Sequence, residues 1–116
     1  MQIRKTYQAI KPELLYAETR DLVLKQRTTA AEAKLETYSL PTDSSSFIYR
    51  GILTFKIQGA AGKTSKECLR VHIVGSDKHE TKVMLDIDEK LFSKKKFTAV
   101  QEDLNFVFRA YDVKPN

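Results

Sequence analysis

The sequence predicts an α+β fold, in which an N-terminal helix packs on a four- to five-stranded antiparallel sheet. In the first part of the chain, apolar residues recur every three or four positions, as in a helix that lies on a core. After the loop-like stretch 41–46, apolar and polar residues alternate instead, which is typical of half-buried strands. Short polar segments separate the alternating runs, so we expect hairpins and an antiparallel sheet.

The 116 residues suit one domain, residues 1–116, and their apolar fraction of 41% is enough for a buried core. Cys68 is the only cysteine, so no internal disulfide forms and stability does not require an oxidising compartment. The N-terminal residues lead into no long apolar run, and no stretch is long enough to cross a bilayer. We therefore expect a cytoplasmic protein that does not associate with membranes.

The helix is predicted over residues 12–36. Pro12 suits a first helical position, and Glu13 lies at the positive end of the helix dipole. The expected apolar stripe consists of Leu14, Ala17, Leu24, Ala31, Leu35 and Tyr38. An alternative is a break at the β-branched pair Thr28 and Thr29, with the helix ending near Gln26 and a strand over residues 34–40.

Four strands are predicted from alternation, over residues 46–58, 67–75, 81–88 and 103–112. A further strand near residues 2–9 has a weaker pattern. A helix followed by antiparallel strands resembles the element order of cystatin-like and nuclear-transport-factor-like rolls. The resemblance concerns the order of elements alone and implies nothing about function.

Two motifs point toward bound phosphate or metal, and neither has the required context. Gly62-Lys63-Thr64 lacks a glycine at position 57, and a strand rather than a helix is expected after it. Cys68 and His72 lie four residues apart on a predicted strand, hence about 13 Å apart, too far to share one ion. We therefore predict no cofactor and no metal site.

Paired carboxylates are the remaining catalytic candidate. Asp86 and Asp88 project from the same side of a predicted strand, with Cα atoms about 6–7 Å apart. The neighbouring lysines Lys82 and Lys90 favour ordinary exposed acids instead. The sequence therefore predicts no catalytic residue, and we expect a protein that is not an enzyme.

The chain is basic, with 20 Lys and Arg residues against 15 Asp and Glu, and a formal net charge of +5. A modest excess of this kind favours anionic partners, so binding of nucleic acid is the first alternative function. The residues predicted to carry it are Arg50, Lys63, Lys66, Arg70, Lys94, Lys95 and Lys96. The stretch after Arg50 lacks the aromatic residue of an RNA-stacking signature.

The leading hypothesis is a small non-catalytic module for protein binding or assembly. A helix covers only one sheet face, so apolar residues on the other face are available to a protein partner or a second copy. The predicted interface residues are Ile48, Ile52, Val74, Met84, Val107 and Tyr111. A third hypothesis is a small-molecule pocket between helix and sheet, lined by Tyr16, Tyr38 and His72.

Overall fold

The computed structural model describes residues 1–57, 66–76 and 80–111, which form five strands and two helices. In chain order these are β1 (Gln2–Tyr7), α1 (Pro12–Leu24), β2 (Thr28–Leu40), β3 (Asp43–Ile57), β4 (Glu67–Ser76), β5 (Thr81–Ile87) and α2 (Lys94–Val107). The strands form one antiparallel sheet in the order β1-β5-β4-β3-β2. The predicted α+β class is confirmed.

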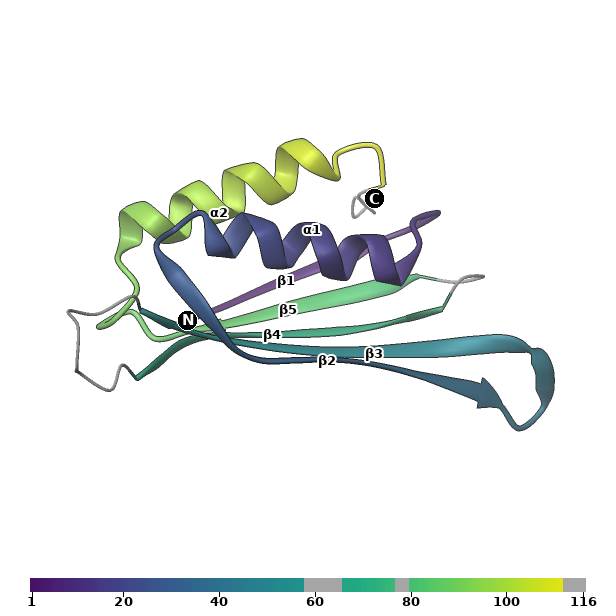
Figure 1. Cartoon of the computed structure of the whole chain (residues 1–116). Coiled ribbons are helices and arrows are strands. Elements are labelled where there is room, and N and C mark those ends of the chain that lie inside the picture. Colours follow the sequence, from purple (N-terminus) through teal and green to yellow (C-terminus); the bar gives the residue numbers. More distant parts are fainter. Residues whose placement is uncertain (58–65, 77–79, 112–116) are drawn as a thin grey trace.

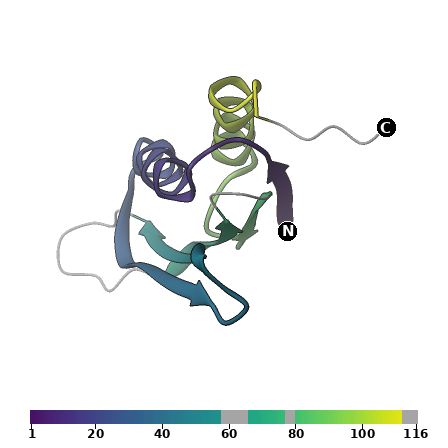
Figure 2. The same cartoon turned by 90° about the vertical axis from the view of Figure 1, so that its right-hand side faces the viewer.

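The molecule has two layers, and both helices lie on the same face of the sheet (Figures 1 and 2). No described segment covers the opposite face. The β2–β3 hairpin reaches beyond the ends of the helices (Figure 1), and the molecule measures 49 × 31 × 19 Å.

The core lies between the sheet and the helices. Apart from Cys68, the buried apolar residues of the strands follow the two-residue period that one covered face requires. The strands contribute Ile3, Tyr7, Leu53, Phe55, Leu69, Val71, Ile73, Val83, Leu85 and Ile87. Helix α1 approaches β3 at Gly51, where an added Cβ would lie 2.8 Å from the Tyr16 ring, so a glycine is needed at this close approach.

The predicted helix over residues 12–36 is wrong in its second half, because α1 ends at Leu24. Arg27 adopts a positive φ of 58°, which turns the chain, and the Thr28 hydroxyl donates a hydrogen bond of 2.8 Å to the Val23 carbonyl. Residues 28–40 then form β2. The alternative break at the threonine pair is therefore the correct one.

The predicted apolar stripe is also wrong, because it is not the buried face of α1. Leu14 is 49% exposed, and Leu24 is exposed as well. The buried residues of the helix are Pro12, Leu15, Tyr16, Thr19, Leu22 and Val23. These residues also follow three- and four-residue spacing. The segment therefore contains two helical stripes, and the one that ends at Val23 is the buried one.

The predicted strand over residues 103–112 is also wrong, because residues 94–107 form α2. Ser93 caps this helix by accepting a hydrogen bond of 3.3 Å from the Lys96 N–H. Val100, Leu104 and Phe108 are buried at four-residue spacing, whereas Phe106 is 69% exposed. Leu104 and Phe108 therefore belong to a helical stripe, and the exposed Phe106 between them made the pattern look like strand alternation.

The other three predicted strands are confirmed, with small shifts of their ends. The predicted ranges 46–58, 67–75 and 81–88 correspond to β3, β4 and β5. The weak N-terminal pattern is a strand as well, and β1 pairs with β5. The resemblance to cystatin-like and nuclear-transport-factor-like rolls stays a prediction.

Candidate functional site: the uncovered face of the sheet

The sheet face opposite the helices, here called the outer face, is the candidate functional site. Residues that pair directly across antiparallel strands project from the same side, so the strand register defines which side chains are neighbours. The first cross-strand row is Lys34, Ile52, His72, Met84 and Arg4. The second row is Glu36, Arg50, Val74, Lys82 and Thr6. The third row is Glu32, Thr54, Arg70, Asp86 and Gln2.

The centre of the outer face is apolar. Val74 projects from the central strand and is 43% exposed, and the half-buried Ile52 and Met84 occupy the adjoining row. Charged side chains surround this centre. The basic ones are Arg4, Lys34, Arg50, Arg70 and Lys82, and the acidic ones are Glu32, Glu36 and Asp86.

A hollow of about 450 Å³, here called the basic hollow, lies over β1, β5 and β4. Its lining residues are Arg4, Lys5, Thr6, His72, Val74, Lys82, Val83 and Met84. Cationic groups from two strands therefore lie beside an apolar floor. This combination suits an anionic group that is attached to an apolar one.

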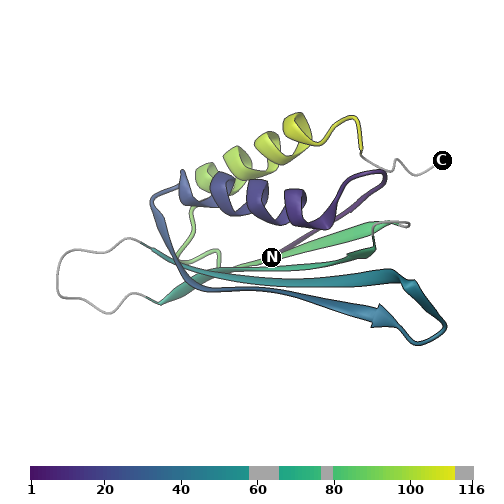
Figure 3. The same ribbon diagram turned by 45° about the vertical axis from the view of Figure 1, so that its right-hand side comes forward.

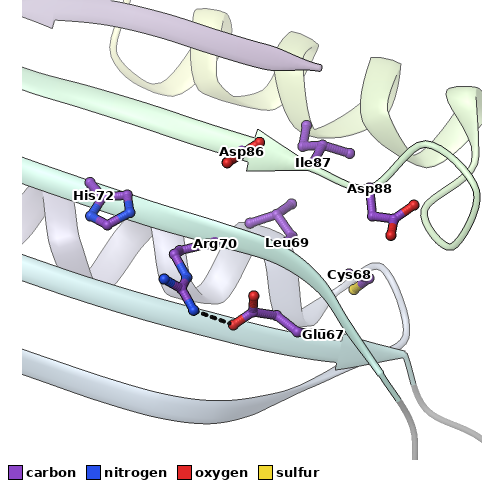
Figure 4. A pocket seen from close by; sticks show the side chains of 8 residues that line it. All are labelled: Glu67, Cys68, Leu69, Arg70, His72, Asp86, Ile87 and Asp88. Carbon is purple, nitrogen blue, oxygen red and sulfur yellow. Dashed lines mark hydrogen bonds and ion pairs between the residues drawn. The ribbon is translucent and has the colours of Figure 1, made fainter.

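A second hollow of about 470 Å³, here called the mixed hollow, lies over β4 and β5 toward the opposite end of the sheet (Figure 4). Its lining residues are Glu67, Cys68, Leu69, Arg70, His72, Asp86, Ile87 and Asp88. Arg70 forms an ion pair of 3.1 Å with Glu67 and is the cross-strand partner of Asp86. The arginine is therefore placed between carboxylates, and His72 lines both hollows.

Two side chains of the mixed hollow, Cys68 and Asp88, contact the backbone of the chain. The Cys68 thiol is buried and donates to the Phe55 carbonyl at 3.5 Å, and burial raises the pKa of this thiol, which disfavours the nucleophilic thiolate. The Asp88 carboxylate accepts a hydrogen bond of 2.9 Å from the Lys90 N–H and so stabilises the turn after β5. In the described part of the chain, no three His, Cys, Asp or Glu side chains are grouped to hold a metal ion.

The structure brings together four of the six predicted interface residues. Ile48, Ile52, Val74 and Met84 are on the outer face. The other two are elsewhere because the last part of the chain is helical. Val107 is the last residue of α2, and Tyr111 packs against the core, where its carbonyl accepts from the Gln8 N–H.

The predicted nucleic-acid residues fall on two sides of the molecule. Arg50 and Arg70 are on the outer face, and Lys66 is exposed just before β4. The triplet 94–96 begins α2, in the helical layer on the other side of the sheet (Figure 1). Lys63 lies outside the described residues. The predicted set is therefore not one surface.

Sequence reasoning missed three basic residues of the outer face. Arg4 lies in the weakly predicted β1, and Lys34 lies in a segment predicted as helix. Lys82 lies within the predicted strand over residues 81–88, and its assignment to the outer face follows from the alternation of that strand.

The residues of the predicted small-molecule pocket do not gather around one space. Tyr16 is buried between α1 and β3, on the helical side of the sheet. His72 is on the outer face, and Tyr38 is 47% exposed near the tip of the β2–β3 hairpin. Tyr16 and His72 are therefore on opposite sides of the sheet, which is incompatible with the predicted pocket.

Comparisons of the chain with family models, curated proteins and solved structures found no match. In the part of the chain that the structure describes, no helix is long and apolar enough to span a membrane.

Proposed function

We propose that this protein is a non-catalytic binding module that engages a protein partner through the outer face. The observation that carries the proposal is Val74, which is 43% exposed at the centre of a sheet face that no described segment covers. Ile52 and Met84 extend this apolar centre along the adjoining row. Apolar surface framed by charged side chains is the usual composition of a protein interface.

The charges on this face define the chemistry of the partner. Arg50 and Lys82 flank Val74 directly in its row, and Arg4 adds a third cation at the basic hollow. An apolar side chain of the partner would be buried against Val74, while its carboxylates face these cations. Burial would supply most of the affinity, and the charges would select acidic partners and accelerate encounter.

Affinity capture from lysate with a matched pair of variants tests this proposal. Val74→Glu places a carboxylate at the apolar centre, and we expect binding of the captured partner to weaken about tenfold or more. Phe106→Glu is the control, because Phe106 is 69% exposed on α2, in the other layer. Equal capture by wild type and both variants would contradict the proposal.

Nucleic acid is the second candidate, and the basic residues of the outer face favour it. Five basic and three acidic residues occupy the three rows, among them Arg50 and Arg70 on neighbouring strands. Nucleic-acid binding would weaken steeply as salt rises, whereas binding at an apolar centre would weaken little. Fluorescence anisotropy with labelled oligonucleotides at low and near-physiological salt distinguishes the two. Arg50→Ala and Arg70→Ala test the outer face, and Ala at residues 94–96 tests α2.

We also propose that the protein is located in the cytoplasm. Its support is the single cysteine, which is free and buried and requires no oxidising compartment. Fractionation of cells that express the tagged protein would test this location.

A further inference from the structure

Strand β2 presents a long edge that no described strand pairs with. The sheet order places β2 at the margin, where its one partner among the described strands is β3. β2 has 13 residues, whereas the other edge strand, β1, has six. Its side chains from residue 29 to residue 39 are exposed, except for the half-buried Leu35. An edge of this length offers a row of backbone donors and acceptors to another strand.

Two usual protections of an edge strand, proline and β-bulges, are absent from residues 32–39 of β2. No proline occurs between its first and last residues, and its register with β3 is regular from Glu32 to Ser39. Charged edge strands usually repel copies of themselves because their charges have one sign. Here the charges alternate, since Glu32, Lys34 and Glu36 project in turn from the outer face.

This alternation makes the edge complementary to itself in one antiparallel register. When Leu35 of one copy is opposite Leu35 of the other, Lys34 is opposite Glu36 twice, once on each side of the two-fold axis. In the same register Ala33 is opposite Thr37, and the Tyr38 ring, whose hydroxyl donates to Glu36 in its own chain, is opposite Glu32. Opposite charges that face each other across strands are favourable.

The neighbouring registers are less favourable. A register centred on Lys34 places two lysines opposite each other and Glu32 opposite Glu36, so like charges face each other at three pairs. A register centred on Ala33 places Lys34 opposite Glu32, which is favourable. Its paired segment, however, extends into the irregularity between Ala30 and Glu32 and is therefore shorter. The register centred on Leu35 avoids both problems.

We infer that β2 is a homodimerisation edge, at which a second copy of this chain pairs antiparallel about a two-fold axis at Leu35. The two sheets then form one continuous sheet, with all helices on one side. The two outer faces become one larger surface on the other side. This inference concerns the strand edge and does not depend on the partner proposed for the outer face.

Sedimentation equilibrium over a wide range of protein concentration tests the pairing. Wild type is expected to pass from monomer to dimer mass as concentration rises. Lys34→Glu alone and Glu36→Lys alone each place like charges opposite each other twice, so each variant should stay monomeric at concentrations where wild type is dimeric. An equimolar mixture of the two variants should regain the dimer mass, because both charge pairs are then complementary.

Lys90→Glu is the matched control, since it reverses an exposed charge in the turn after β5, away from the β2 edge and outside the rows of the outer face, and it should dimerise like wild type. Circular dichroism establishes that each variant is folded. A wild type that stays monomeric throughout would overturn the inference and leave this edge to a strand of a different protein. Dimers that persist in both single variants, or a mixture that stays monomeric, would overturn it as well.

A disulfide trap tests the register without changing any charge. In the proposed register the two Leu35 Cα atoms lie about 5 Å apart, within disulfide reach, so oxidised Leu35→Cys should run as a covalent dimer. Ala33→Cys is the control, because its two copies would lie about 13 Å apart along the strand pair. The buried Cys68 stays in place in both variants. Crosslinking of Ala33→Cys in preference to Leu35→Cys would overturn the register.

Discussion

At the scale of single residues, Cys68 couples the stability of the fold to pH. The thiol is 1% exposed, and its burial raises its pKa above the ordinary value of 9.0. The folded chain therefore retains this proton at pH values where the unfolded chain has lost it. The resulting contribution to stability is complete below about pH 9 and decreases as pH rises toward the folded-state pKa.

We therefore expect the free energy of unfolding of the wild type to fall above about pH 9, by at most about 1.4 kcal/mol per pH unit from this group. Urea titrations at a series of alkaline pH values measure it. In Cys68→Ala the cysteine part of the decline should be absent. A smaller decline should remain, because burial also raises the pKa of Tyr16. Parallel stability curves for wild type and Cys68→Ala would contradict this account.

At the scale of elements, the charges at the start of α2 are unfavourable for the helix. Lys94, Lys95 and Lys96 occupy its first turn, where the helix dipole is positive, and no acidic residue lies in that turn. Ser93 supplies the cap. A repulsive triplet at this position is a local exception to the charge pattern that favours helices.

We expect Lys95→Glu to raise the free energy of unfolding by about 0.3–1 kcal/mol, because a carboxylate replaces a cation at the positive helix end. Chemical denaturation at low salt measures this gain, and added salt should reduce it. The exposed Lys95→Gln variant is the control and should gain about half as much, since it removes one charge without adding another. A loss of stability in both variants would contradict the dipole argument.

The same elements show how far local sequence patterns determine the fold. β3, β4 and β5 were predictable because apolar residues, many of them β-branched, recur at every second position in each of them. α2 was not, because Leu104, Phe106 and Phe108 satisfy a two-residue period, and only Val100 extends the helical stripe that is buried. Tertiary packing decides between two such periods.

The residues of the outer face could be predicted from the sequence only where the strands that carry them were predicted. Ile52, Val74, Arg50 and Arg70 follow from the alternation of β3 and β4, whichever strands lie beside them. The row that ends at Arg4 depends on the pairing of β1 with β5, about 80 residues apart in the sequence. Local patterns carry no information about such distant pairing, so the full width of the outer face appears only in the structure.

At the scale of the whole molecule, stability should be unevenly distributed across the sheet. β4 and β5 are paired on both sides, and their helical faces are fully buried under α1 and α2. β2 is paired on one side, and its hairpin with β3 reaches beyond the helices (Figures 1 and 3). Opening free energies follow burial and pairing, so local opening should concentrate in β2.

We expect amide hydrogen exchange in dilute protein to be slowest in β4 and β5 and fastest, among the strands, in β2. Raising the protein concentration should slow exchange in β2 alone, because self-pairing protects the N–H groups that point away from β3. In dilute Lys34→Glu, the strands should exchange in the same order as in wild type, because the substitution leaves the monomer intact. Raising the concentration of this variant should not slow exchange in β2, because the substitution disfavours self-pairing. Exchange in β2 as slow as in β4 at every concentration would mean that this edge is covered within the monomer.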